Sequence, residues 1–329
     1  MVSTNQRSSW KKRITLVAVT AGAMLVLAAC GGPAGQSQST VDSPPTKVAL
    51  ITHSAPGDTF WDIVRKGAEQ AAQKDNIELH YSSDPDGSKQ AQLVQQAIDR
   101  NVDGIVVTLA KTDALSDVVR DAVSAGIPVV SINSGEEDWE QLGVLAHFGQ
   151  NESVAGEAVG TELNDRGAKK AVCVIHEQGN VGLESRCQGV GNTFSGDFEV
   201  IYVTGVDMPN VASTITSKLQ TSPDIDYVIT LGAPFAMTAI DSISDAGSSA
   251  KLATFDMNSG VVDAIQAGSI QFLVDQQPYL QGYAAVDNLW LYNTNGNILG
   301  GNKTVLTGPQ IITSETADTV SEFVKNGTR

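Results

Sequence analysis

The sequence has few cysteines, few aromatic residues and few basic residues for its length. Its 329 residues include only 3 Cys, 5% Phe, Trp and Tyr, and 21 Lys and Arg against 37 Asp and Glu, which gives a formal net charge of −16. A nucleic-acid-binding surface needs clustered basic side chains to neutralise phosphates, so this charge excludes a nucleic-acid partner. Hydrophobic residues make up 41% and charged residues 18% of the chain, a composition typical of a globular protein.

Long apolar runs are also scarce, because only residues 14–29 form one. A single run excludes a membrane protein with several spans. Four basic residues and no acidic one precede it, and it is too short for a typical transmembrane helix. We therefore predict a secretory signal peptide over residues 1–29. Its removal leaves 17 basic residues against 37 acidic ones, a net charge of −20.

The residues around Cys30 indicate how the exported protein is attached to the membrane. Leu27-Ala28-Ala29-Cys30 looks like a bacterial lipobox, which implies that Cys30 becomes the lipidated first residue of the mature chain. Residues 30–46 are rich in Gly, Ser, Pro and Gln and predict a flexible tether. We expect an extracytoplasmic lipoprotein anchored to the cell membrane, the alternative being an uncleaved anchor.

Cys173 and Cys187 could pair in an oxidising compartment, or both could be free thiols.

From residue 47 onward, short apolar strands alternate with amphipathic helices. The predicted strands cover residues 48–51, 77–81, 104–110, 128–133, 144–148, 170–176, 198–204, 227–231, 252–256 and 270–276, with one more extended segment at 304–312. The predicted helices cover residues 59–74, 88–100, 114–125, 151–165, 182–193, 209–220, 234–246, 260–267, 278–293 and 317–326. Continuous apolar strands separated by helices are typical of parallel sheets with both faces covered. The pattern restarts after about residue 148, so we predict an α/β protein with two doubly wound parallel-sheet lobes.

Motifs of several enzyme classes are absent. The sequence has no phosphate-binding loop, dinucleotide fingerprint or nucleophile elbow. Its four histidines lack the spacing of a zinc site. We therefore expect no metal and no cofactor. Ligands of such folds bind at the carboxyl ends of the strands. The loops expected there combine aromatic, amide, carboxylate and guanidinium groups, which suit a neutral, hydroxyl-rich ligand.

Seven short segments, in order, resemble the ribose/galactose-type substrate-binding proteins of bacterial ABC sugar importers. They are residues 59–68, 102–115, 125–130, 148–160, 184–189, 254–256 and 274–278. The resemblance covers residues 47–313 and implies a type I periplasmic binding protein, with two lobes joined by a three-segment hinge. The implied lobes are residues 47–149 plus 277–307 and residues 150–276 plus 308–329.

The resemblance also implies a set of ligand-binding residues. They are Asp58, Phe60, Trp61, Asn133, Arg186, Asp256 and Gln276. Six of them have a local alternative: helix-start packing and an N-terminal turn for Asp58, Phe60 and Trp61, a helix cap for Asp256, a hinge role for Gln276 and a solvated surface for Arg186. This chain departs from the family pattern at Ser134, Gly232, Ala233 and Met208, and has Asn133 where the family commonly has Asp. These departures argue against ribose itself and leave a pentose, hexose, polyol or cyclitol, or a different small polar ligand.

The implied function is that of a monomeric solute receptor, and not of an enzyme. It would bind a small sugar or polyol between its lobes and deliver it to an ABC permease, whose ATPase supplies the energy. The alternatives are a ligand-sensing lipoprotein that feeds a membrane receptor with a sugar or autoinducer signal, or an exported enzyme. Replacing Arg186 or Asp256 with alanine is expected to abolish ligand binding while the fold persists.

Overall fold

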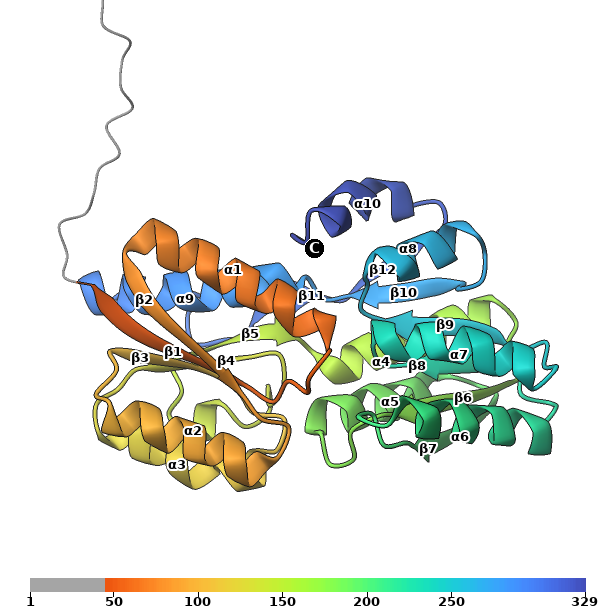
Figure 1. Cartoon of the computed structure of the whole chain (residues 1–329), viewed down its shortest axis with the longest axis horizontal. Helices are drawn as coiled ribbons and strands as arrows, with labels where there is room; N and C mark the ends of the chain where they lie inside the picture. Colours follow the sequence, from red (N-terminus) through yellow and green to blue (C-terminus); the bar gives the residue numbers. More distant parts are fainter. Residues whose placement is uncertain (1–44) are drawn as a thin grey trace, which may run out of the picture. The chain divides into compact units, whose positions relative to one another are not determined.

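Residues 45–329 are described by a computed structural model, and they form two α/β lobes (Figure 1). Cys30, the predicted signal peptide and residues 30–44 of the predicted tether lie outside the described residues. Each lobe contains one six-stranded sheet, so the prediction of two doubly wound lobes is confirmed. In the described part of the chain, no helix has both the length and the hydrophobicity needed to cross a bilayer.

The first sheet is parallel throughout. Its strands, in spatial order, are β11 (Val305–Gly308), β5 (Ala146–Gln150), β4 (Val129–Ile132), β3 (Gly104–Thr108), β1 (Thr46–Thr52) and β2 (Ile77–Ser83). Every residue of β3, β4 and β5 is buried, as expected for strands covered on both faces. Side chains that alternate along β1 pack into two different cores, one on each face of the sheet.

The second sheet repeats the arrangement with one antiparallel edge. Its strands, in spatial order, are β12 (Gln310–Thr313), β10 (Phe272–Asp275), β9 (Lys251–Phe255), β8 (Tyr227–Thr230), β6 (Lys170–Ile175) and β7 (Asp197–Tyr202). Only β12 runs antiparallel to its neighbour. The extended segment predicted at 304–312 is therefore two strands in two sheets. Pro309 separates them, because proline has no amide hydrogen to continue a ladder.

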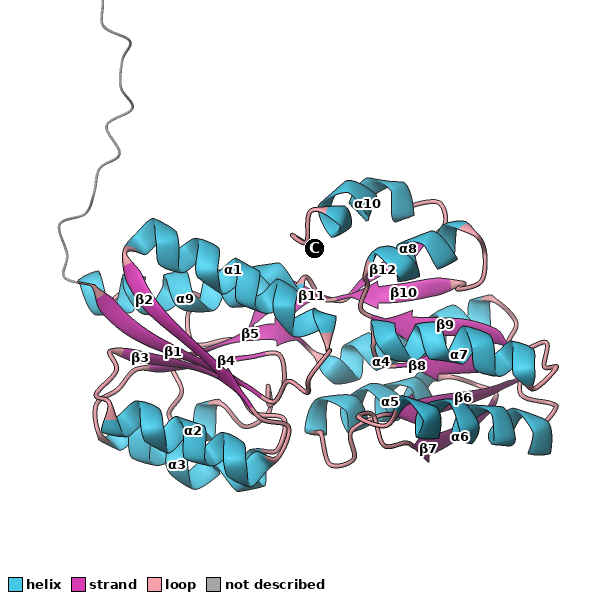
Figure 2. Ribbon diagram, in the orientation of Figure 1, coloured by secondary structure: helices cyan, strands magenta, loops and turns pink. Residues whose placement is uncertain are grey.

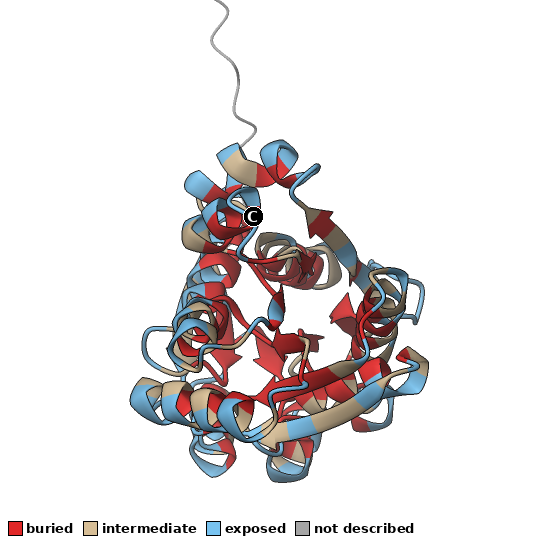
Figure 3. Ribbon diagram, turned by 90° about the vertical axis from the view of Figure 1, so that its right-hand side faces the viewer, coloured by how far each residue is buried: buried red, intermediate tan, exposed pale blue. Residues whose placement is uncertain are grey.

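Helices cover both faces of each sheet (Figure 2). In the first lobe, α1 (Thr59–Asp75) and α9 (Pro278–Asn295) pack on one face, and α2 (Gly87–Asp99) and α3 (Thr112–Ser124) on the other. In the second lobe, α4 (Glu152–Asp165) and α5 (Val181–Thr193) pack on one face. The other face carries α6 (Met208–Thr221), α7 (Ala233–Asp245), α8 (Ser259–Gln266) and α10 (Ala317–Lys325). Figure 3 shows the buried strands between helices whose outer sides are exposed.

Local sequence signals explain where these helices begin. The side chains of Asp58, Asn151 and Asn180 each accept a hydrogen bond from a backbone amide in the first turn of α1, α4 and α5, which satisfies donors that have no partner within the helix. A short 3-10 helix, η1 (Glu140–Leu142), lies in the connection between β4 and β5, where no helix is predicted from the sequence. Trp139 and Leu142 bury this segment against the core.

Glycines allow two pairs of helices to approach closely. A Cβ atom on Gly282 of α9 would lie 1.9 Å from the carbonyl oxygen of Val64 in α1. A Cβ atom on Gly156 of α4 would lie 2.1 Å from the carbonyl oxygen of Arg186 in α5, and Gly189 makes the reciprocal approach. Any larger residue at these positions would separate the helices. The position of Arg186 therefore depends on the glycine contact between α4 and α5.

Three segments connect the two sheets. The chain passes from β5 to α4, from β10 to α9 and from β11 to β12. Gln276 lies in the second of these connections, between the last residue of β10 and the start of α9. The three-segment hinge implied by the family resemblance therefore corresponds to three places where the chain passes from one lobe to the other.

Candidate functional site

A cleft of about 820 Å³ opens at the carboxyl ends of the strands, between loops of the two lobes. Its lining includes residues that follow β1, β4, β6, β8, β9 and β10. All seven residues implied by the resemblance lie in this lining: Asp58, Phe60, Trp61, Asn133, Arg186, Asp256 and Gln276. The structure thus brings together side chains that are separated by up to 218 positions in the sequence.

The first turn of α1 supplies an aromatic and an acidic group to the cleft. Phe60 and Trp61 pack edge to face, with ring centroids 5.0 Å apart, and Trp61 also meets the ring of His53 at 4.8 Å. Both aromatic side chains belong to the core of the first lobe, so the helix-start packing considered from the sequence is also present. Asp58 Oδ1 accepts a hydrogen bond of 3.1 Å from the amide of Phe60, which fixes this carboxylate at the rim.

Gln276 connects a residue of each lobe. Its Oε1 accepts from Asn133 Nδ2 at 3.0 Å, and its Nε2 donates to Asp256 Oδ1 at 2.7 Å. Asn133 and Asp256 each follow the last residue of a strand, β4 and β9, and both have positive φ angles, 65° and 63°. Asn and Asp tolerate this left-handed conformation better than most residues. The resulting turns bring both side chains to the hinge.

Arg186 forms a buried ion pair that the sequence does not reveal. Its Nε and Nη2 donate to the two carboxylate oxygens of Glu152 at 2.6 and 2.8 Å. The Arg186 and Glu152 residues are only 3% and 6% exposed. The guanidinium also lies 4.8 Å from the ring centroid of Phe255, and Nη1 lies 4.0 Å from Asp256 Oδ2. Glu152 therefore neutralises and orients the guanidinium, and no free positive charge is left for an anionic ligand.

The signal for Glu152 in the sequence is weak. An acidic residue in the first turn of a helix is common, because it complements the positive end of the helix dipole. Only the close approach of α4 and α5 shows that this carboxylate is the partner of Arg186.

Burial changes the acid strength of the cleft carboxyl groups. Desolvation raises the pKa of Asp256 to about 7, although Arg186 and the hydrogen bond from Gln276 act in the opposite direction. Desolvation also raises the pKa of Asp58 to about 6, against the stabilising hydrogen bond from the Phe60 amide. Both groups can accept hydrogen bonds from ligand hydroxyls once ionised.

The raised pKa of Asp256 predicts that ionisation of this one group costs the unliganded protein stability as pH rises. The folded pKa of Asp256 lies above its unfolded value, so ionisation opposes folding between about pH 4 and pH 7. In the Asp256→Asn variant the side chain cannot ionise, so the variant does not have this free-energy cost. We expect the melting temperature of the wild type to fall relative to that of Asp256→Asn between pH 5 and pH 8. Asp241→Asn, at an exposed position of α7, is the matched control, and parallel curves for all three proteins would contradict the assignment.

A second set of contacts joins the lobes along one edge of the cleft. Lys111 Nζ, from the loop after β3, lies 3.0 Å from Glu177 Oε1 in the loop after β6. The amide of Val181 donates to the carbonyl oxygen of Ala110 at 3.0 Å, and Asn180 Nδ2 lies 3.2 Å from His53 Nε2. The sequence places these loops at the ligand-binding ends of the strands but does not single out these residues, because their partners lie in the other lobe.

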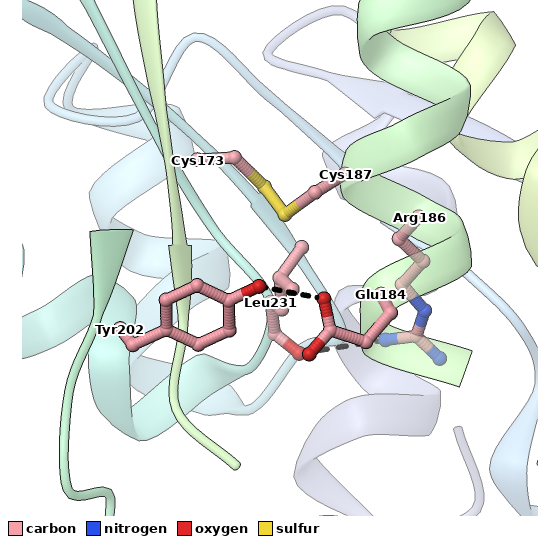
Figure 4. The surroundings of a disulfide bond; sticks show 6 residues. All are labelled: Cys173, Glu184, Arg186, Cys187, Tyr202 and Leu231. Atoms are coloured by element: carbon pink, nitrogen blue, oxygen red, sulfur yellow. Dashed lines mark hydrogen bonds between the residues drawn. A yellow bond between two sulfur atoms is a disulfide. The ribbon is translucent and has the colours of Figure 1, made fainter. Parts of the chain in front are cut away.

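Cys173 in β6 and Cys187 in α5 are joined by a disulfide. Figure 4 shows this bond beside Arg186, which directly precedes Cys187 and donates to the carbonyl oxygen of Leu231. On the same helix, Glu184 accepts a hydrogen bond of 2.9 Å from the hydroxyl of Tyr202. The disulfide therefore ties the helix that carries Arg186 to β6, the strand beside the edge strand β7 of the second sheet. Across residues 45–329, no group of three or more His, Cys, Asp or Glu side chains is arranged to hold a metal ion.

Comparison with known proteins identifies the family. A carbohydrate transporter protein of Acidothermus cellulolyticus 11B, solved in complex with myo-inositol, is 51% identical and superposes with a TM-score of 0.86 over 87% of this chain and 100% of that chain. The ribose import binding protein of Bacillus subtilis is 25% identical over 233 residues, 69% of this chain and 75% of that protein. The xylose/arabinose-binding protein of Sulfolobus acidocaldarius is 23% identical over 217 residues, 60% of this chain. The chain spans about half, 54%, of the length of that last relative.

A match to a family model covers most of both lobes. The model of the periplasmic binding protein domain matches residues 48–297, which include both sheets except for β11, β12 and the first two residues of β1. The resemblance inferred from seven short segments is thereby confirmed, and the chain belongs to the periplasmic binding protein family.

Proposed function

We propose that this protein is an extracytoplasmic solute receptor that binds a small sugar or polyol in its cleft and delivers it to the permease of an ABC importer. The observation that carries the proposal is the convergence of Asp58, Asn133, Arg186, Asp256 and Gln276 with two aromatic side chains in one cleft. Fixed carboxylate and amide groups can bind ring hydroxyls in set directions, while Phe60 and Trp61 can cover the apolar face of a ring.

The charge balance of the cleft favours a neutral ligand. Arg186 is paired with Glu152 and Lys111 with Glu177, so neither cation is free to hold a ligand carboxylate or phosphate. Because Asp58 and Asp256 are acidic and poorly solvated, they would disfavour an anion further. The relatives support this choice, since their names refer to ribose, xylose and arabinose, and the Acidothermus cellulolyticus protein was solved in complex with myo-inositol.

The mode of action follows from the hinge. Three chain segments connect the lobes, so a hinge motion can open and close the cleft. We assign residues 47–149 plus 277–307 to the first lobe and residues 150–276 plus 308–329 to the second. The protein acts as a monomer that captures its ligand unchanged, and ATP hydrolysis belongs to the partners of the permease. Import is favoured over sensing because the Bacillus subtilis relative is an import binding protein.

The cellular location is part of the same proposal. Residues 1–29 act as a signal peptide, and Cys30 carries the lipid that anchors the mature protein to the cell membrane. The tether predicted at residues 30–46 then ends at residue 45, because Thr46 is the first residue of β1. Such an anchor would raise the concentration of the receptor near its permease.

A ligand screen tests the function. The purified protein is melted with D-ribose, D-xylose, D-galactose, xylitol, myo-inositol and scyllo-inositol. A ligand at 100 times its Kd is expected to stabilise the fold by about 2.7 kcal/mol, which is measurable as a rise in Tm. Isothermal titration then gives the Kd, and mass spectrometry checks that the ligand is recovered unchanged. Absence of a shift with every compound, or conversion of the ligand, would refute the proposal.

A further inference from the structure

A stacked pair of aromatic rings lines the cleft, and neither residue is among the seven predicted to bind the ligand. His176 directly follows β6, and Phe235 lies in the first turn of α7. Their rings are stacked, with centroids 3.8 Å apart and an interplanar angle of 17°. Both residues are part of the cleft lining. The pair comes from the second lobe, whereas Phe60 and Trp61 come from the first.

Two glycines make room for this pair. A Cβ atom on Gly205, after β7, would lie 2.6 Å from the carbonyl oxygen of His176 and 3.2 Å from Phe235 Cζ. A Cβ atom on Gly232, after β8, would lie 3.3 Å from Phe235 Cδ2 and 3.7 Å from His176 Cε1. The loops after β7 and β8 thus contribute no side chain at these two positions.

The surroundings of His176 determine its protonation. Burial lowers the pKa of His176 to about 3, with further lowering by Arg186 and His53, so the imidazole is neutral at physiological pH. A neutral imidazole has one N–H donor and one acceptor nitrogen. Nδ1 is buried and has no hydrogen-bond partner in the described residues. A proton on Nδ1 would leave a buried donor unsatisfied, which is costly.

From this geometry we propose that His176, held by its stack on Phe235, is a ligand-binding residue that donates Nε2–H to a ligand hydroxyl oxygen. Because Nδ1 is buried without a partner and the residue lines the cleft, the proton belongs on Nε2. The proposal rests on the proposed function as a sugar or polyol receptor, and it adds a donor to a site otherwise rich in acceptors. Asp58 and Asp256 accept from hydroxyls, whereas His176 recognises the oxygen of a hydroxyl at the β6–β8 side of the cleft.

The test compares two amide substitutions at the same position. In His176→Gln the amide nitrogen can reach the position of Nε2, whereas in His176→Asn it reaches only the position of Nδ1. The ligand is the member of the screening panel that the wild type binds most tightly. We expect His176→Asn to raise the Kd roughly 10-fold, the order of magnitude of one hydrogen bond, and His176→Gln to raise it less. Phe235→Leu, which keeps a hydrophobic side chain but removes the stack, is expected to weaken binding as well.

Further measurements separate this role from loss of folding or of function. His80→Asn, at an exposed position of β2, is the control and should leave the Kd unchanged. Long-range 1H–15N spectra of the unliganded wild type should show His176 as the Nε2–H tautomer with no titration between pH 5 and pH 9. An Nδ1–H tautomer, a titration near pH 6.5, or a wild-type Kd in His176→Asn would overturn the inference and leave the proposed function intact. If the wild type binds no compound of the panel, both are overturned.

Discussion

Replacing Arg186 with alanine is expected to abolish ligand binding and to lower the free energy of unfolding by about 3–5 kcal/mol. The loss of stability arises from Glu152, whose two carboxylate oxygens accept from Arg186. Since Glu152 is 6% exposed, the variant leaves a carboxylate buried without its cation. Binding is lost because the guanidinium, which lines the cleft beside Asp256, can no longer donate hydrogen bonds to the ligand. Chemical denaturation and isothermal titration measure the two effects.

A double variant separates the two roles of Arg186. Arg186→Ala with Glu152→Gln removes the unpaired charge, while the amide oxygen can still accept from Gln150, as Glu152 does at 2.8 Å. We expect the double variant to regain part of the stability but none of the binding. Equal stability of the single and double variants would show that the ion pair does not carry the loss. The sequence leads us to expect that the fold persists without Arg186. The structure adds that this variant should be less stable, because Glu152 loses its partner.

Reduction of the Cys173–Cys187 disulfide is expected to lower the free energy of unfolding by about 3 kcal/mol, because the bond closes a short loop in the unfolded chain. The two cysteines are separated by 14 positions. The bond also holds α5 against β6 next to Arg186 (Figure 4), so the Kd for the ligand should rise on reduction. Denaturation with and without a thiol reductant measures the first effect, and titration measures the second.

The matched control for reduction is the double variant Cys173→Ala with Cys187→Ala. Its stability should be close to that of the reduced wild type and should not respond to the reductant. If fully reduced wild type, checked by thiol titration, unfolds at the same denaturant concentration as the oxidised protein, the disulfide does not stabilise the fold. A response of the double variant to reductant would show that the effect arises elsewhere in the chain.

Much of the fold could be predicted from local patterns. The helical spacing of apolar residues in α1 and the continuous apolar strands β3 and β4 depend on neighbours a few residues away. The cap residues Asp58, Asn151 and Asn180 act within one helical turn. The division at Pro309 was missed, because two short strands without a loop between them have the same local pattern as one strand. Which sheet each strand joins depends on partners about 35 to 160 positions away.

The candidate site divides in the same way. Local sequence patterns predict the fold class and the alternation of strands and helices, and the family resemblance implies the seven residues that line one cleft. Only the folded chain shows that Glu152 neutralises Arg186, that Gln276 connects Asn133 to Asp256, and that His176 stacks on Phe235. The physical reason is that periodicity and capping act over one or two turns, whereas ion pairs, amide bridges and ring stacks join whichever residues packing brings together.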